Sequence, residues 1–204
     1  MEQGTDDWFA ARCGKVTASR IADVMAKTKT GYGAGRKNYL AQLVIERLTG
    51  DIAEGYTNAA MLWGIETEKY AREAYEIETG EIVEQVGFID HPAIPMTGAS
   101  PDGLVGIDGM LEIKCPNSAT HIETLLSGKV AKQYILQMHW QMMCAGRAWC
   151  DFVSYDPRMP EGLQYWSQRV TLDESLAADI TSEVNVFLDD LDAQAAELDK
   201  LRAA

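Results

Sequence analysis

The chain alternates segments whose apolar residues repeat every three or four positions with segments of alternating or continuous apolar residues. The first pattern predicts helices and the second predicts strands. Helices are expected over residues 17–27, 38–49, 58–79 and 132–144 and along the apolar stripe 176–191. Gly50 and Gly80 directly follow two of these segments, and glycine commonly ends a helix. Thr57 is the expected N-cap of the third helix, and Thr17 or Ser19 that of the first.

Strand-like runs are concentrated in the second half of the chain. They span residues 82–90, 104–107, 110–114, 148–155 and 163–170. Asp108-Gly109 separates the second run from the third and is typical of a β-hairpin turn. The glycine-rich stretch 28–35 lacks the ending of a phosphate-binding P-loop, and we expect a plain loop there. Helices and strands in this order predict one α/β domain over 1–204, with a central mixed sheet flanked by helices.

Length and composition exclude several classes of protein. The 204 residues are 47% hydrophobic and 24% charged, which excludes a disordered chain and is typical of a globular one. No apolar run approaches the roughly 20 residues of a membrane span, and the polar start MEQGTDD is unlike a signal peptide. Four cysteines without a CxxC pair and three dispersed histidines argue against disulfide and zinc chemistry. We therefore expect a cytoplasmic protein without a membrane partner.

Charge is distributed unevenly along the chain. The formal net charge of −13 argues against nucleic-acid binding, because Lys and Arg are needed to neutralise phosphates. Residues 12–47 nevertheless contain eight basic and two acidic residues, so this segment carries +6 and the remainder −19. This segment weakens the argument against nucleic-acid binding without removing it, because a solvated helix face has the same composition.

The segment SPDGLVGIDGMLEIKCP, residues 100–116, carries the candidate chemistry. Side chains alternate along a strand, so Glu112 and Lys114 share one face while Ile113 points to the other. Two carboxylates, Asp102 and Glu112, together with a lysine suit metal-assisted hydrolysis of a phosphodiester. Exposed strands also carry such residues for solubility, so the pattern by itself leaves both interpretations open.

The geometry of the predicted hairpin decides whether the two carboxylates meet. An ideal two-residue turn would place Asp102 and Glu112 on opposite faces of the strand pair. A bulge or a wider turn shifts the pairing by one residue, which restores the parity that places both carboxylates on one face. Bulges often re-aim side chains at active sites. We therefore predict such an irregularity near Gly103 or Gly106.

The same segment resembles the PD-(D/E)xK nuclease motif, with Pro101-Asp102 and Glu112-Ile113-Lys114 as its two halves. Along almost its whole length the chain is similar to the lambda-exonuclease-type, or YqaJ-type, family of viral recombinases. Its landmarks occur in family order at compatible spacing. They are EQGTDDW (2–8), ARCGKVTAS (11–19), WGIETEKYAR (63–72), ASPDGL (99–104), LEIKCP (111–116), the Gln137 helix and SYDPRMPEGLQY (154–165). The resemblance implies a restriction-endonuclease-like core around the mixed sheet.

The resemblance implies a role for each matching residue of the catalytic centre. Asp102, Glu112 and the backbone carbonyl of Ile113 match ligands of catalytic Mg²⁺. The family pattern implies two such ions in each active site, with Mn²⁺ as a substitute. Glu68 matches an additional acid that helps to organise the second ion, and Lys114 matches the catalytic lysine.

Further matches concern the attacking water and the DNA end. Gln137 matches a glutamine that helps to place the water. Arg12, Thr17 and Ser19 lie in the segment that forms the pocket for a 5′-phosphate in the family. Met61 lies where the family has an apolar wedge that helps to split the terminal base pair.

The function implied by the resemblance is a processive 5′-to-3′ exonuclease that acts on linear double-stranded DNA. It would release 5′-mononucleotides from 5′-phosphorylated ends and leave a 3′ single strand for annealing. The resemblance also implies a ring-shaped homotrimer, a single-strand annealing protein as partner, and a phage or prophage origin in a bacterial host. Two alternatives remain: a structure-specific or internally cutting PD-(D/E)xK endonuclease, and a non-catalytic module that binds DNA ends during recombination.

Overall fold

A mixed sheet of five strands forms the centre of the fold. The computed structural model describes residues 2–29, 31–52 and 59–203, except the side chains of residues 60, 61 and 203. The strands are β4 (Val83–Glu84), β7 (Gly103–Val105), β8 (Gly109–Lys114), β9 (Trp149–Tyr155) and β10 (Tyr165–Thr171). Their spatial order is β10-β9-β8-β7-β4. Because β8 and β9 are parallel and the other neighbours antiparallel, the predicted mixed sheet is confirmed.

Two smaller sheets accompany the central one. The first has the order β1-β6-β5, with β1 (Val16–Thr17), β6 (Thr97–Ala99) and β5 (Ile89–Asp90). The second is a hairpin of β2 (Lys27–Thr28) and β3 (Gly31–Tyr32).

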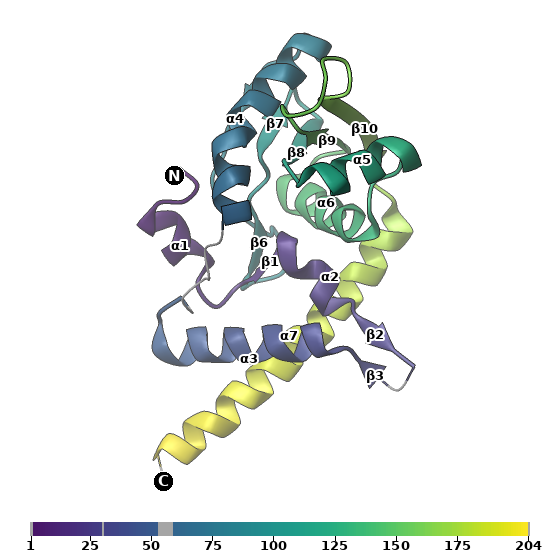
Figure 1. The fold of residues 1–204 in the computed structure, drawn as a ribbon. Helices are drawn as coiled ribbons and strands as arrows, with labels where there is room; N and C mark the ends of the chain where they lie inside the picture. The colour runs from purple at the N-terminus through teal and green to yellow at the C-terminus, as the bar shows by residue number, and fades with distance from the viewer. Residues whose placement is uncertain (1, 30, 53–58, 204) are drawn as a thin grey trace.

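Helices lie on both sides of the central sheet (Figure 1). They are α1 (Asp6–Arg12), α2 (Ile21–Val24), α3 (Ala34–Thr49), α4 (Ala59–Thr79), α5 (Ser118–Ser127), α6 (Lys132–Ala145) and α7 (Glu174–Ala203), with a 3₁₀ turn, η1 (Ala18–Arg20), directly before α2. In Figure 1, α4 lies on one side of β7 and β8, and α5 and α6 lie on the other. The long α7 passes α3 and extends away from the sheet to the C-terminus.

Alternate residues of β8 face different helices. Leu111 and Ile113 pack with Tyr75 of α4, whereas Met110 packs with Met138 of α6. Burying an apolar side chain of this size contributes roughly 1.5–3 kcal/mol, so a one-residue slip of the strand would be costly. The sheet register is therefore fixed by packing on both of its faces.

A second core joins α2, α3, α6 and α7 beside the central sheet. Its largest buried members include Ile21, Tyr39, Trp140 and Phe187. Val16 and Ala18 are also buried in it, so this core fixes the chain between α1 and α2.

Several expected elements differ from the structure near the N-terminus. The helix predicted over 17–27 is wrong as a single element, because Thr17 belongs to β1 and only 18–24 are helical. Pairing of β1 with β6 and the hydrogen bond from the Thr17 N–H to the Tyr39 hydroxyl keep this residue extended. Within the stretch 28–35 where we expect a loop, Thr28 ends β2, residues 31–32 form β3, and residues 34–35 begin α3.

Other differences concern elements that local patterns do not reveal. The run 82–90 is divided between β4 and β5, which belong to different sheets. Helices α1 and α5 are absent from the predicted set; α5 begins at the N-cap Asn117, whose side chain accepts from the Thr120 N–H. The predicted N-cap Thr57 lies outside the described residues. Gly80, with a φ of +74°, follows α4 as predicted.

None of the helices within the described ranges is both long and apolar enough to cross a membrane.

Candidate active site

The hairpin between β7 and β8 contains the wider turn that the sequence predicts. Val105 pairs with Gly109, so three residues form the turn instead of two. Gly106 has a φ of +54°, a left-handed conformation that glycine adopts without steric cost. Continuing the register places Asp102 opposite Glu112, and residues directly opposite one another share a face of the sheet. The predicted irregularity is confirmed, and it restores the parity of the two carboxylates.

The Glu112 carboxylate is only 1% exposed and is held by three side chains. Gln137 donates its Nε2 proton to Oε1, and Gln141 donates its Nε2 proton to Oε2, both at 2.7 Å. The ammonium of Lys114 forms an ion pair with Oε1. The two glutamines lie four residues apart on α6, which places both amides on one face of that helix.

Asp102 lies directly before β7 and is tied to β8 through its carboxylate. Its Oδ2 accepts a hydrogen bond from the backbone N–H of Ile113 at 2.6 Å. Burial raises the pKa of Asp102 well above its ordinary value, and the negative charge of Glu112 raises it further. Lys114 and the Ile113 N–H act in the opposite direction. Two carboxylates that repel each other in this way form a site that an added cation would stabilise.

Lys114 is the positive charge of this cluster. Burial would lower the pKa of Lys114, but the charges of Glu112 and Asp102 and the bond to Glu112 raise it above its ordinary value. Its Nζ also lies 5.3 Å from the ring centroid of Tyr134. Lys114 therefore carries its proton at neutral pH.

Glu68 approaches the same cluster from α4. A cavity of about 400 Å³ is lined by Glu68, Asp102, Ile113 and Lys114, among others. Glu68 forms an ion pair with Arg72, one helical turn further along α4. Burial raises the pKa of Glu68. The negative charge of Glu112 raises it further, whereas the positive charge of Arg72 lowers it. The structure thus brings together the five residues predicted for catalysis, although it does not test the role of each.

The donor set suits a hard divalent cation. Within the described ranges, three or more His, Cys, Asp and Glu side chains nowhere gather as a ready-made metal cage. Mg²⁺ does not require one, since it keeps several waters and binds through one or two carboxylates plus substrate phosphate. Asp102, Glu112 and the Ile113 carbonyl would provide such a limited set of oxygen ligands.

Arg12 is hydrogen-bonded to Ser100, in the chain just before Asp102. The Arg12 Nη1 donates to the Ser100 hydroxyl at 3.3 Å, and the Trp8 indole N–H donates to the same oxygen at 2.9 Å. The guanidinium also stacks on the Trp8 ring at 4.0 Å from its centroid. Burial lowers the pKa of Arg12 without removing its charge, because a guanidinium stays protonated in proteins. Since Ser100 precedes Asp102 by two residues, this cation lies on the segment that leads to the carboxylates.

The other residues predicted to bind the DNA end are Thr17, Ser19 and Met61. Thr17 is the N-cap of η1, but its side chain makes no capping hydrogen bond. Ser19 is exposed within η1. In the described part of the chain, neither hydroxyl is hydrogen-bonded to Arg12. Met61 lies in α4, and its side chain is outside the described residues.

Two residues of the cluster are absent from the predicted set. Gln141 contacts Glu112 directly. The sequence feature that could have indicated this contact is the spacing of four residues between Gln137 and Gln141, which places both on one face of the predicted helix. Ser100 contacts Arg12 over a separation of 88 residues, and no local pattern indicates such a contact.

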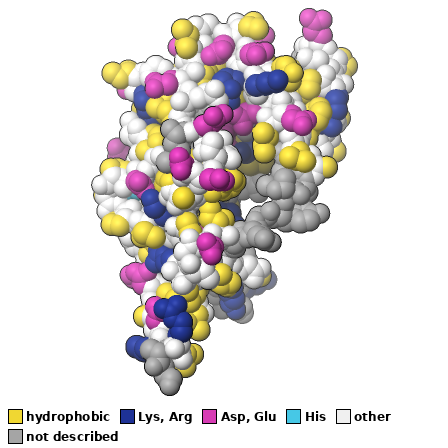
Figure 2. Space-filling view, turned by 90° about the vertical axis from the view of Figure 1, so that its left-hand side faces the viewer, with side chains coloured by type: hydrophobic (Ala, Val, Ile, Leu, Met, Phe, Trp, Pro, Cys, Tyr) yellow, Lys and Arg dark blue, Asp and Glu magenta, His cyan; other side chains and the backbone are white. Residues whose placement is uncertain are grey.

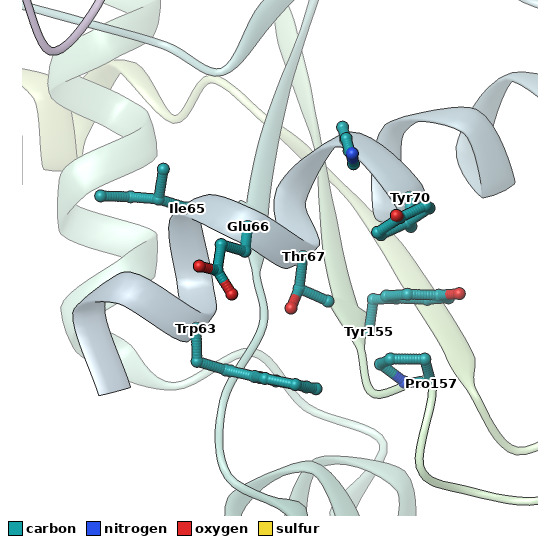
Figure 3. A pocket seen from close by; sticks show the side chains of 8 residues that line it. Trp63, Ile65, Glu66, Thr67, Tyr70, Tyr155 and Pro157 are labelled. Carbon is teal, nitrogen blue, oxygen red and sulfur yellow. The ribbon is translucent and has the colours of Figure 1, made fainter. Parts of the chain in front are cut away.

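A further cavity of about 560 Å³ lies on a neighbouring face of α4 (Figure 3). Its lining includes Trp63, Glu66, Thr67 and Tyr70 of α4, and Tyr155 and Pro157 at the end of β9. The guanidinium of Arg158 lies 4.4 Å from the ring centroid of Trp63 and donates to the Pro116 carbonyl at 3.0 Å. This contact connects α4 with the chain that follows β8.

Comparisons with known proteins identify the family. Residues 7–148 match the model of the YqaJ-like viral recombinase domain, which is more than half of the chain. The chain belongs to the YqaJ-like viral recombinase family. This membership confirms the resemblance drawn from the sequence and makes the chain an exonuclease-type nuclease. A comparison with curated proteins found no match.

Solved structures support both the family and the fold. An alkaline exonuclease from Laribacter hongkongensis is 55% identical, with 98% of each chain covered and a TM-score of 0.91. The same exonuclease in complex with dAMP matches with 55% identity, the same coverage of 98%, and a TM-score of 0.92. A phage-related exonuclease from Haemophilus somnus is 16% identical over 90% of this chain and 96% of its own, with a TM-score of 0.72. That last likeness shows the fold alone, which is the predicted α/β nuclease fold.

Proposed function

We propose that this chain is a Mg²⁺-dependent 5′-to-3′ exonuclease that degrades one strand of linear double-stranded DNA. The observation that carries the proposal is that Asp102 and Lys114 line one cavity and Glu112 forms an ion pair with Lys114, with the cation of Arg12 on the adjoining segment. Carboxylates and a lysine provide the chemistry, and the neighbouring arginine provides a means of recognising a phosphorylated end. Family membership and the 55% identical alkaline exonuclease support the same activity.

Asp102, Glu112 and the Ile113 carbonyl would hold the metal, with Glu68 organising a second ion. A bound divalent ion polarises the scissile phosphate and lowers the pKa of a coordinated water. Mg²⁺ suits these oxygen ligands, and Mn²⁺ is the expected substitute. Lys114, protonated beside Glu112, offsets the charge that develops on the phosphate. Gln137 holds the Glu112 carboxylate through its amide and is the proposed residue for placing the water.

In the proposed reaction, a water attacks the second phosphate counted from the 5′ end, which joins the terminal nucleotide to the next one. The oxygen of a water forms a bond to phosphorus, and the bond from phosphorus to the 3′ oxygen of the terminal nucleotide breaks. The departing 3′ oxygen takes up a proton, and the terminal residue leaves as a 5′-mononucleotide. The shortened strand begins with a new 5′-phosphate, so each cut regenerates the end that Arg12 would bind. The complex of the related exonuclease with dAMP supports mononucleotide release.

Arg12 would form the 5′-phosphate pocket together with Thr17 and Ser19. An arginine presents a planar fork of donors that matches phosphate oxygens, and hydroxyls add neutral donors. The hydrogen bond of Arg12 to Ser100 directs the guanidinium towards the segment of Asp102. Met61, near the start of α4, is the proposed wedge that separates the terminal base pair.

A ring-shaped homotrimer would explain how an acidic protein remains on DNA. On the face shown in Figure 2, acidic and basic side chains are interspersed over the surface. A ring that encircles the duplex retains it by topology, so continued digestion needs no broad basic surface. We propose that residues 1–204 form one exonuclease domain of such a ring. We also propose that it acts in the cytoplasm of a bacterial host, with a phage or prophage origin, and passes 3′ strands to a single-strand annealing protein.

Linear duplex labelled separately at each terminus tests the proposed activity, with and without Mg²⁺. We expect 5′-mononucleotides to appear from the 5′ ends and only when Mg²⁺ is present. Covalently closed circular duplex is the control, and it should stay intact. Cutting of the circle at the rate of linear DNA would contradict the exonuclease and favour an endonuclease. Retention of DNA ends without any product would favour a non-catalytic binding module.

Arg12→Ala tests the phosphate pocket separately from the chemistry. We expect digestion of 5′-phosphorylated ends to fall by more than that of 5′-hydroxyl ends, because only the former lose a charged contact. Ser19→Ala and Thr17→Ala should show the same preference to a smaller extent. Equal losses on both kinds of end would contradict the pocket assignment.

A further inference from the structure

Gln141 is a buried polar residue that the proposed catalytic roles leave without a function. Its side chain is 0% exposed, and its Nε2 donates to Oε2 of Glu112 at 2.7 Å. Its Oε1 is also buried and has no hydrogen-bond partner among the described residues. An unpaired buried carbonyl oxygen costs free energy, so packing alone would favour Met or Leu at this position. The contact with Glu112 is what a glutamine provides here.

The orientation of the Gln141 amide is fixed by the charge it faces. Reversing the amide would place its oxygen against a carboxylate oxygen, and two acceptors repel each other. The surroundings are apolar, since α6 packs its Met138 and Met142 against Cys150 and other residues of the sheet. A charge-assisted hydrogen bond is strong in such surroundings.

Gln141 is also the only donor of the cluster that binds Oε2 of Glu112. Gln137 and Lys114 both bind Oε1, so they leave the carboxylate free to turn about that oxygen. A carboxylate offers about four lone-pair positions, of which these three side chains use three. The remaining position is on Oε2, the oxygen that Gln141 holds in place.

We propose that Gln141 is a positioning residue that fixes the plane of the Glu112 carboxylate and directs its remaining lone pair to a divalent cation. The inference rests on the proposed function, in which Glu112 is a metal ligand. Gln141 itself touches neither metal nor DNA in this account. It acts through Glu112, as residues that hold a metal ligand commonly do.

Mn²⁺ binding without DNA tests this role independently of catalysis. Isothermal titration calorimetry would compare the unmodified protein with Gln141→Met and with the matched control Met142→Leu, a buried neighbour on α6. We expect Gln141→Met to weaken Mn²⁺ binding by about 10- to 100-fold, and the control to stay within about twofold. The unfolding midpoint of metal-free Gln141→Met should equal or exceed that of the unmodified protein, because the unpaired carbonyl is removed. DNA digestion by Gln141→Met should require more Mn²⁺ and recover at high concentration.

Mn²⁺ affinity of Gln141→Met within about twofold of the unmodified protein would overturn the inference and leave the proposed function intact. If this variant does not fold, Gln141→Asn replaces it, because the shorter amide keeps its polarity but falls short of Oε2. The same loss of affinity is expected, and unchanged affinity would again overturn the inference. Failure of the unmodified protein to bind Mn²⁺ at all would overturn the proposed metal site and the inference with it.

Discussion

Tyr75 anchors α4, the helix that carries Glu68, to the central sheet. Its ring is fully buried, and its hydroxyl donates to Oδ2 of Asp151 on β9 at 2.8 Å. Arg169 on β10 binds both oxygens of the same carboxylate at 2.8 Å. Burial and the hydrogen bond to Asp151 raise the pKa of Tyr75, so the hydroxyl remains a donor at any physiological pH.

Tyr75→Phe removes this donor while keeping the ring in its cavity. A hydrogen bond to a charged group contributes about 1.5–3 kcal/mol. The carboxylate keeps both bonds from Arg169, so the lower half applies and we expect a loss of about 1.5–2 kcal/mol. For a chain of 150–250 residues this corresponds to a fall in Tm of roughly 3–8 °C.

Equilibrium unfolding in urea, followed by circular dichroism at one fixed protein concentration, measures this loss. Fixed concentration matters because assembly of subunits would shift the apparent stability. Tyr70→Phe is the matched control, since Tyr70 lies on the same helix and is 49% exposed. The control should change the free energy of unfolding by less than about 0.5 kcal/mol. Equal effects of the two substitutions would refute the reasoning about the buried hydrogen bond.

Two further predictions concern the strands around the site. Gly109→Ala would place a Cβ 2.1 Å from the Trp149 ring, so we expect the free energy of unfolding, measured by thermal unfolding, to fall by about 1–3 kcal/mol. The control Gly64→Ala places its Cβ in open space and should be neutral or stabilising. A similar loss for both would contradict the steric account. Burial would raise the pKa of Asp156, but hydrogen bonds from Arg158 and Ser118 lower it to about 2, below its unfolded value of about 3.9. Asp156→Asn should therefore cost stability above about pH 4, and the deficit in urea unfolding should shrink towards pH 2; a deficit independent of pH would count against this ion pair.

The sequence predicts the parts of the fold that periodic patterns and turn chemistry determine. The α6 helix and strands β8 and β9 agree with the predicted segments to within one residue at each end, and α7 contains the predicted stripe 176–191 but continues to Ala203. The parity of Asp102 and Glu112 requires an irregular turn, and Gly106 provides it. These features are local, so residues near one another in the chain are sufficient to predict them.

Other features depend on contacts between distant segments. Thr17 is extended because β1 pairs with β6, and the run 82–90 is divided because its two ends join different sheets. Ser100 contacts Arg12 across a separation of 88 residues. Hydrophobic periodicity does not predict such contacts, because it indicates which face of an element is buried but not which segment covers that face.

The central claim is that Asp102, Glu112 and Lys114 form one divalent-ion site. An anomalous difference map from a crystal soaked in Mn²⁺ tests it most directly. The account predicts a peak between the carboxylates of Asp102 and Glu112, next to the Ile113 carbonyl, and loss of that peak in Asp102→Asn. A map without a peak among these residues would contradict the claim.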